Sequence, residues 1–292
     1  MNNQKYKGIL LIILSALFFA LMATTVKGVS HFPLVQKVFF RNFVGLVILS
    51  IYMRKHKALL RINHKPLLLG RSLLGLTGVF LYYQSLSLLN LSEAVVINKL
   101  SPFFVVLLGG LILKEKIKPL QVLAILVALT GMILVVQPTA NVNLGPALIG
   151  LTGALAAAGA YTIIRQLRHY DGPLTIVFYF CLISTLITLP LLIPVFVMPS
   201  LKEALLLILI GVFALIAQIL MTNAYHYAPA SQLSIYTYLN IVFSSVLGLV
   251  LFKENLEINF LFGAGLIILG GLMNFLAHRQ GPKGKEELKS SQ

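Results

Sequence analysis

Residues 92–136, SEAVVINKLSPFFVVLLGGLILKEKIKPLQVLAILVALTGMILVV, return in altered form as residues 231–276, SQLSIYTYLNIVFSSVLGLVLFKENLEINFLFGAGLIILGGLMNFL. A shift of 139 positions superimposes the two stretches. The matched positions are Ser92 with Ser231, Leu100 with Leu239, Gly109 with Gly248, Lys114-Glu115 with Lys253-Glu254, and Gly131 with Gly270. Each stretch holds two apolar segments that are long enough to cross a hydrocarbon core, which takes roughly 20 helical residues. The sequence therefore contains two copies of one helical unit.

The composition is that of a membrane protein. Of the 292 residues, 58% are hydrophobic and 11% are charged, and the mean hydropathy is +0.93. Soluble chains carry about 25% charged residues, and disordered chains are poor in aliphatic residues, so both classes are excluded. The single cysteine, Cys181, excludes a disulfide framework and a Cys-rich metal site.

Apolar segments of transmembrane length follow one another along almost the whole chain. We predict ten spans, at residues 8–26, 34–53, 67–89, 94–113, 119–137, 145–164, 174–198, 204–225, 232–252 and 258–277. The connections between them are short and leave no room for a soluble domain.

The two copies are predicted to have opposite orientations in the membrane, because each holds five spans and five is an odd number. We predict an all-α polytopic membrane protein with two inverted five-helix repeats, at residues 1–143 and 144–277, and a disordered cytoplasmic tail at residues 278–292. Inverted repeats are typical of secondary transporters, which bind solute near the midplane at the repeat interface. A duplication that only builds a stable bundle is the structural alternative.

Most of the 23 Lys and Arg residues fall in connections on one side of this topology. The other side holds Lys27, Lys37, Lys202 and Lys253, while Arg41, Arg71 and Lys99 lie within predicted spans. Short loops rich in Lys and Arg stay in the cytoplasm, so we predict that both termini are cytoplasmic. The net charge of +15 then reflects topology rather than nucleic-acid binding. We expect a multi-pass protein of a plasma membrane, and a bacterial one because the loops are short.

Longer motifs in both halves resemble those of a known family. SLSLLNLSEAVVINKLSPFFVVLLGGLILKEKIKPLQ, followed by LTGMILVV, is similar to the repeat unit of the drug/metabolite transporter (DMT) superfamily, EamA type. NAYHYAPASQ, followed by LGLVLFKENL and LIILGGLMN, resembles the second unit. The resemblance covers about residues 8–277. It implies a ten-helix transporter that moves small organic solutes, commonly outward, with both termini in the cytoplasm, and it does not fix the solute.

Three cationic residues lie within predicted spans, where an ionisable group costs several kcal/mol unless it faces a polar cavity or a partner. Arg41 and Lys99 lie about 10 Å and about 8 Å below the outer ends of their spans, so both reach one level of a shared cavity. They favour a carboxylate or phosphate there, which Arg41 can hold through two hydrogen bonds. Pairing of Glu93 with either cation is the alternative. Arg71, nearer the cytoplasmic end, either joins the site or snorkels to the headgroups.

Polar side chains in other spans are further candidates for a solute site. Asn98 and Lys99 precede Ser101-Pro102, where proline frees a backbone carbonyl and kinks the helix. Gln232, Tyr236 and Asn240 recur at intervals of four residues, which places them on one face of a predicted helix. Such a face contacts a pocket or makes interhelical hydrogen bonds. The remaining candidates are Tyr83, Gln218, Asn223 and Tyr238 for binding, and Glu93 and His226 for proton coupling.

The motifs that are missing narrow the function. No G-x-x-x-x-G-K-[ST] loop and no H-E-x-x-H motif occur, so we expect neither direct ATP hydrolysis nor a metal or other cofactor. The first and fifth spans contain no Asp or Glu, unlike small cation-extruding multidrug pumps, which rest on a membrane carboxylate in their first span.

We therefore predict a secondary transporter, not an enzyme. Its expected solute is a small polar organic metabolite, anionic or zwitterionic, such as a carboxylate or an amino acid, carried by an exporter or exchanger with alternating access. A multidrug or aromatic-solute exporter of the same architecture is the alternative. An integral membrane enzyme acting on lipid-linked substrates would need clustered acids or histidines, which the sequence lacks. The expected partners are a small-molecule solute and the lipid bilayer, with a monomer and a homodimer both open.

Overall fold

The protein is described by a computed structural model that covers residues 2–55, 63–112, 114, 117–136, 144–167, 170–227 and 233–279. These residues form helices and connecting segments, with no strand among them. Ten helical segments are long and apolar enough to cross a membrane, and each corresponds to one predicted span. The prediction of an all-α polytopic fold is confirmed. The predicted tail lies almost wholly beyond the described residues.

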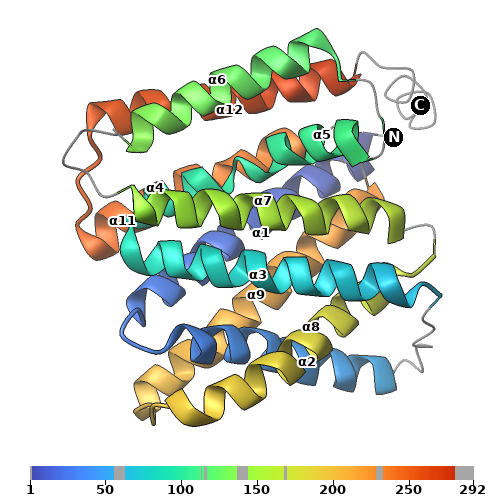
Figure 1. Cartoon of the computed structure of the whole chain (residues 1–292), viewed down its shortest axis with the longest axis vertical. Coiled ribbons are helices and arrows are strands. Elements are labelled where there is room, and N and C mark those ends of the chain that lie inside the picture. Colours follow the sequence, from blue (N-terminus) through green and yellow to red (C-terminus); the bar gives the residue numbers. More distant parts are fainter. Residues whose placement is uncertain are drawn as a thin grey trace.

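The helices alternate in direction, so that α1 begins and α12 ends on the same side of the molecule (Figure 1). The first half comprises α1 (Asn2–Gly28), α2 (Leu34–Lys55), α3 (Lys65–Leu88), α4 (Leu91–Asn98), α5 (Ser101–Ile112) and α6 (Pro119–Val136). The second half comprises α7 (Gly145–Leu167), α8 (Pro173–Leu192), η1 (Ile193–Val195), α9 (Leu201–Tyr227), η2 (Ser234–Tyr238), α11 (Leu239–Phe252) and α12 (Ile258–Arg279). We call the side where α1 begins the terminal face and the opposite side the distal face.

The fourth span is broken into α4 and α5, at the position where the sequence predicts a kink. Pro102 has no N–H, and its ring would clash with the carbonyl of Asn98 in a continuous helix. The chain tightens instead, with the Leu100 N–H donating to the Ile97 carbonyl at 3.0 Å. The ninth span lacks this proline, yet at the matching repeat position it runs as the 3₁₀ helix η2 before α11 begins. Both copies therefore lose α geometry at mid-span.

The helix packing has the symmetry expected of inverted repeats. Helix α3 packs on α7, and their repeat partners α9 and α1 pack on each other in the same way. Helix α5 packs on α7 as α11 packs on α1, and α2 packs on its own partner α8. Figure 1 shows the remaining pair, α6 and α12, side by side at one end of the bundle. Each helix lies five spans along the chain from its repeat partner, an odd number, so the two copies have opposite orientations.

Small residues bring α6 and α12 into backbone contact. A Cβ atom at Gly131 would lie 2.6 Å from the carbonyl oxygen of Gly263, and one at Gly263 would lie 2.5 Å from that of Gly131. Only glycine fits at so close an approach, as is common between membrane helices. The Gly-rich segment of α12 is therefore a packing surface.

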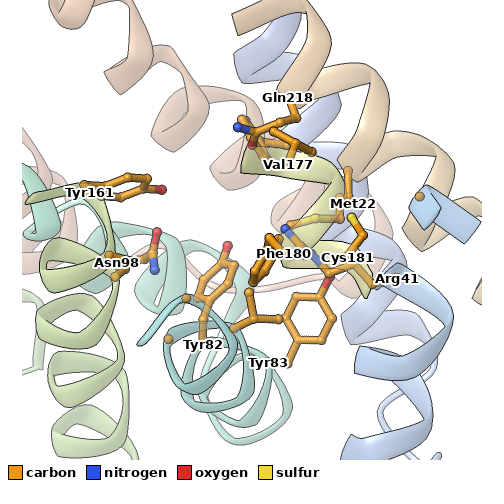
Figure 2. Close-up of a pocket in the computed structure, with 18 of the residues that line it drawn as sticks. Met22, Arg41, Tyr82, Tyr83, Asn98, Tyr161, Val177, Phe180, Cys181 and Gln218 are labelled. Carbon is orange, nitrogen blue, oxygen red and sulfur yellow. The ribbon is translucent and has the colours of Figure 1, made fainter. Parts of the chain in front are cut away.

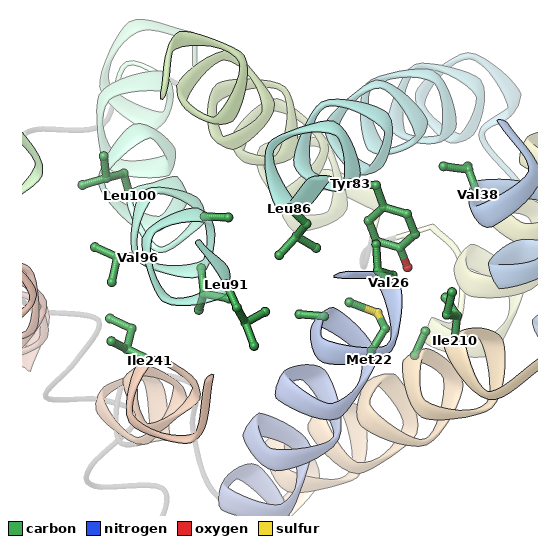
Figure 3. Close-up of a cluster of buried hydrophobic side chains, with 14 of the residues drawn as sticks. Met22, Val26, Val38, Tyr83, Leu86, Leu91, Val96, Leu100, Ile210 and Ile241 are labelled. Carbon is green, nitrogen blue, oxygen red and sulfur yellow. The ribbon is translucent and has the colours of Figure 1, made fainter. Parts of the chain in front are cut away.

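A cluster of buried apolar side chains extends through the bundle, and Figure 3 shows part of it. Val26 near the end of α1, Leu86 near the end of α3 and Leu91 at the start of α4 are each fully buried. Ile210 of α9 and Ile241 of α11 extend the cluster into the second half of the chain. This apolar packing joins the two halves of the chain.

Candidate functional site

A cavity of about 160 Å³ lies at mid-depth between the two halves of the chain. Its lining comes from α1 to α4 in the first half and from α7, α8, α9 and α11 in the second, with Lys99 at the α4–α5 break. The candidate binding residues that line it are Arg41, Arg71, Tyr83, Asn98, Lys99, Gln218 and Asn240. Side chains thus approach one space from both repeats, and the polar ends of Asn98, Tyr161 and Gln218 point toward its centre in Figure 2.

Arg41 lies on α2 with only part of its guanidinium satisfied. Its Nη1 donates to Oδ1 of Asn42 at 2.9 Å, while Nε is buried without a hydrogen-bond partner. The guanidinium carbon lies 5.5 Å from the centre of the Phe180 ring, within the range of a cation–π contact. The fork of donors is therefore held in the cavity wall with unused hydrogen-bonding capacity.

Arg71 is buried in the same wall instead of reaching the headgroups. The residue is 7% exposed, and its guanidinium carbon lies 3.9 Å from the centre of the Phe180 ring. Its Nε and Nη1 are buried without a partner. A Cβ at position 75 would lie 2.7 Å from Nη1, so Gly75 leaves the room that the guanidinium occupies. The snorkelling alternative is wrong, because the side chain is enclosed by α3 and α8 within the bundle.

Lys99 lies at the break between α4 and α5, next to Asn98. Its side chain lines the cavity and makes no hydrogen bond or ion pair with a described residue. The expected alternative, pairing with Glu93, is wrong. Glu93 instead accepts hydrogen bonds from the backbone N–H and the side-chain amide of Asn90, at 3.3 and 2.8 Å, in a capping box at the start of α4. The carboxylate of Glu93 is therefore engaged in the capping box on the distal face.

Some candidate residues lie elsewhere. Tyr238 is buried against Gly271 of α12, Tyr236 packs partly buried beside Ile12 and Leu233, and Asn223 is exposed on α9. Gln232 lies outside the described residues, as does the side chain of His226. The two described members of the predicted polar face both contact α1: Tyr236 packs beside Ile12, and Nδ2 of Asn240 donates to the Ala16 carbonyl at 2.9 Å. Asn240 also lines the cavity.

Aromatic residues complete the cavity, and two of them, Phe180 and Tyr161, were not selected in the sequence analysis. Phe180 of α8 lies under both guanidinium groups, and Tyr161 of α7 presents its hydroxyl to the cavity (Figure 2). Tyr82 of α3 points its hydroxyl the same way. Single aromatic residues in apolar spans give no periodic signal, although Tyr161 follows a run of small residues and so stands out by size.

Glu254, a buried carboxylate on the distal face, pairs with the partly buried Lys27 outside the cavity. Oε1 of Glu254 accepts the Leu91 N–H at 2.5 Å and lies 3.4 Å from Nζ of Lys27, and Oε2 accepts the Ser92 hydroxyl at 3.0 Å. Nζ of Lys27 also donates to the Leu89 carbonyl at 2.6 Å. Glu254, from the second repeat, thereby fixes the start of α4, which belongs to the first repeat. We call these residues the distal cluster.

Comparison with known proteins agrees with this architecture. The model of the EamA-like transporter family matches residues 6–137 and again residues 144–276. The pseudopaline exporter of Pseudomonas aeruginosa is 32% identical over 265 residues, which are 90% of this chain and 93% of the exporter. The riboflavin transporter of Brucella anthropi is 28% identical over 243 residues, which are 81% of this chain and 86% of that transporter.

A solved structure supports the fold alone. A crystal structure of another protein superposes with a TM-score of 0.64 at 19% identity and covers 96% of this chain and 99% of its own. The family and the named relatives are transporters of small metabolites, not enzymes. With the family model matched over both halves and the ten helices in place, the predicted family is confirmed: the chain belongs to the EamA-like transporter family.

Proposed function

We propose that this transporter exports or exchanges a small anionic or zwitterionic organic metabolite, such as a carboxylate or an amino acid, by alternating access. The observation that carries the proposal is the set of three cations, Arg41, Arg71 and Lys99, around one cavity at mid-depth. Keeping ionisable groups at this depth is expensive, and they are found there chiefly where they meet a solute, an ion or each other. A carboxylate would supply the acceptors that the unpartnered arginine donors lack.

The direction and location of transport form part of the proposal. The excess of Lys and Arg in connections on the terminal face supports a cytoplasmic location for both termini, and thus a plasma membrane with the distal face outside. Outward transport is supported by a relative that is named an exporter. The two repeats, over residues 1–143 and 144–277, would rock against each other about the cavity at their interface.

An aromatic solute is the second candidate. Tyr82, Tyr161 and Phe180 border the cavity, and a planar ring could stack on them. Phe180, however, is already contacted by both guanidinium groups, which leaves less aromatic surface for a ligand. The cationic site is therefore the better-supported proposal.

Coupling to protons would require a titrating group near the path. Glu93 is engaged with Asn90 at the distal end of α4, and His226 lies on α9 near the terminal face. Facilitated diffusion or exchange needs neither residue, and the position of Glu93 favours this form of the proposal.

Exchange in proteoliposomes tests the proposal. Vesicles loaded with unlabelled carboxylates, amino acids, sugar phosphates, nucleosides or lipophilic cations are diluted into labelled solute of the same kind, and counterflow is recorded. We expect saturable uptake of an anionic or zwitterionic solute that is accelerated by the same solute inside. Lys99→Ala should lose this uptake, and Lys202→Ala, at the exposed start of α9, should keep it. Counterflow of lipophilic cations alone, unchanged in Lys99→Ala, would contradict the proposal.

A further inference from the structure

The charges that line the cavity all have one sign. Every charged lining residue is a cation, and the lining contains no Asp, Glu or His among the described residues. The described carboxylates belong to other places in the fold. Glu93 is held by Asn90, Asp171 accepts the Asn63 N–H, and Glu203 meets Ser200 and His31. Glu254 belongs to the distal cluster, and Glu257 is exposed just before α12. The cavity therefore offers no described carboxylate to a ligand ammonium group.

The cations stand on two different walls. Arg41 and Arg71 share the Phe180 ring, which belongs to α8. Lys99 follows Asn98 at the α4–α5 break, and Figure 2 shows Asn98 on the side of the cavity opposite Arg41. Lys99 makes no ion pair with a described residue, so a single carboxylate that fills the arginine wall would leave the ammonium group of Lys99 without a counter-charge.

The arginine wall has donors that are ready for an anion. Nε of Arg41 and both Nε and Nη1 of Arg71 are buried without a partner, so this wall keeps hydrogen-bond donors that the protein itself does not use. Between the walls lie neutral polar groups, the hydroxyls of Tyr82 and Tyr161, which suit an uncharged polar middle. Leaving such charges unpaired costs free energy in a medium of low dielectric constant, so a ligand that meets both walls is favoured.

We propose that the solute carries two anionic groups, one held by the Arg41–Arg71 wall and one by Lys99, as in an α,ω-dicarboxylate. The inference rests on the proposed function and narrows its solute class. A monoanion can neutralise the cations of one wall only. A zwitterion places an ammonium group beside a cation with no described carboxylate to receive it.

Thermal stabilisation of the purified full chain in detergent tests the inference, because a ligand that binds the folded form raises the melting temperature. The probes are succinate, glutarate and adipate, each matched in length by a monocarboxylate and by an ω-amino acid, such as pentanoate and δ-aminopentanoate for glutarate. At equal concentration and ionic strength, we expect at least one dicarboxylate to give a shift several times larger than its matched probes. In Lys99→Met that dicarboxylate and its monocarboxylate should give equal shifts, whereas Lys202→Met should behave as the wild type.

The outcomes separate the two proposals. Equal shifts from dicarboxylate and monocarboxylate in the wild type would overturn the two-anion inference and leave an anion transporter. A larger shift from the ω-amino acids would overturn it in favour of a zwitterion. No shift from any of these probes would overturn it as well, and counterflow of the same solutes then decides whether the proposed transport function also fails.

Discussion

Buried and partly buried cations occur in two regions of this protein, and their surroundings differ between the two. On the distal face Lys27 has a carboxylate partner in Glu254 and a backbone carbonyl in Leu89. Lys37, 1% exposed, donates to the Ser87 hydroxyl at 2.9 Å. In the cavity, Arg71 keeps two buried donor atoms without a partner, and Lys99 contacts no described acid.

This difference separates structural cations from those available to a ligand. A cation that fixes the fold is satisfied within the protein, because an unpaired buried charge weakens the folded state. A cation that recognises a ligand has to stay unsatisfied until the ligand arrives. The two regions should therefore respond to substitution in opposite ways.

The largest effect is expected in the distal cluster. Glu254→Gln removes the counter-charge of Lys27 and weakens the acceptor for the Leu91 N–H, and breaking a buried ion pair by changing one partner costs about 3 kcal/mol. We expect a clear fall in the melting temperature of the purified protein. The matched control is Glu93→Gln, since Glu93 caps the same helix from an exposed position. Equal melting temperatures for the two variants would show that the distal cluster adds no stability.

Replacing a cavity cation should reverse that pattern. Arg71→Leu removes a buried guanidinium that lacks partners, so we expect an unchanged or higher melting temperature. Solute binding should weaken by tenfold or more, because a hydrogen bond to a charged group contributes about 1.5–3 kcal/mol. The melting temperature and the solute-induced thermal shift are measured on one preparation of the variant, and counterflow is measured on the same preparation. Arg54→Leu, an exposed arginine at the end of α2, controls for loss of charge. A strongly lowered melting temperature would make Arg71 a structural residue.

A smaller effect is expected at Gly248, which makes room for the distal carboxylate. A Cβ at this position would overlap Oε2 of Glu254, and overpacking of this kind costs about 1 kcal/mol or somewhat more. Gly248→Ala should lower the melting temperature, and its effect should shrink in the Glu254→Ala background, because that second substitution removes the carboxylate that the new Cβ would meet. Gly265→Ala is the control, since its Cβ would meet nothing within 4 Å. Additive effects would argue against a shared contact.

The sequence predicts the architecture better than the site, for physical reasons. Hydropathy and the 139-residue repeat are enough to predict the ten spans. Pro102 is enough to predict the helix break beside Lys99. The shared depth of Arg41 and Lys99 follows from helix rise alone. The contact between Lys27 and Glu254 joins residues far apart in sequence, and no local pattern identifies it.

Local conformation accounts for the rest of what the sequence missed. Periodicity assumes an α-helix throughout, whereas residues 234–238 form the 3₁₀ helix η2. Tyr236 and Asn240 still both contact α1. Phe180 is one of 18 phenylalanines, and only its position between two arginines distinguishes it.

The smallest effect uses Cys181, the single cysteine, as a probe of the sign of the cavity potential. Cys181 lines the cavity, so an anionic methanethiosulfonate should react with it several times faster than a cationic one, after each rate is divided by that for a free thiol. The thiolate fraction of Cys181 is the same for both reagents and cancels in this ratio. Lys99→Met should bring the ratio closer to one, and Lys202→Met should leave it unchanged. A ratio of one in the wild type would mean that the three cations are neutralised within the protein, and the contrast with the distal cluster would be lost.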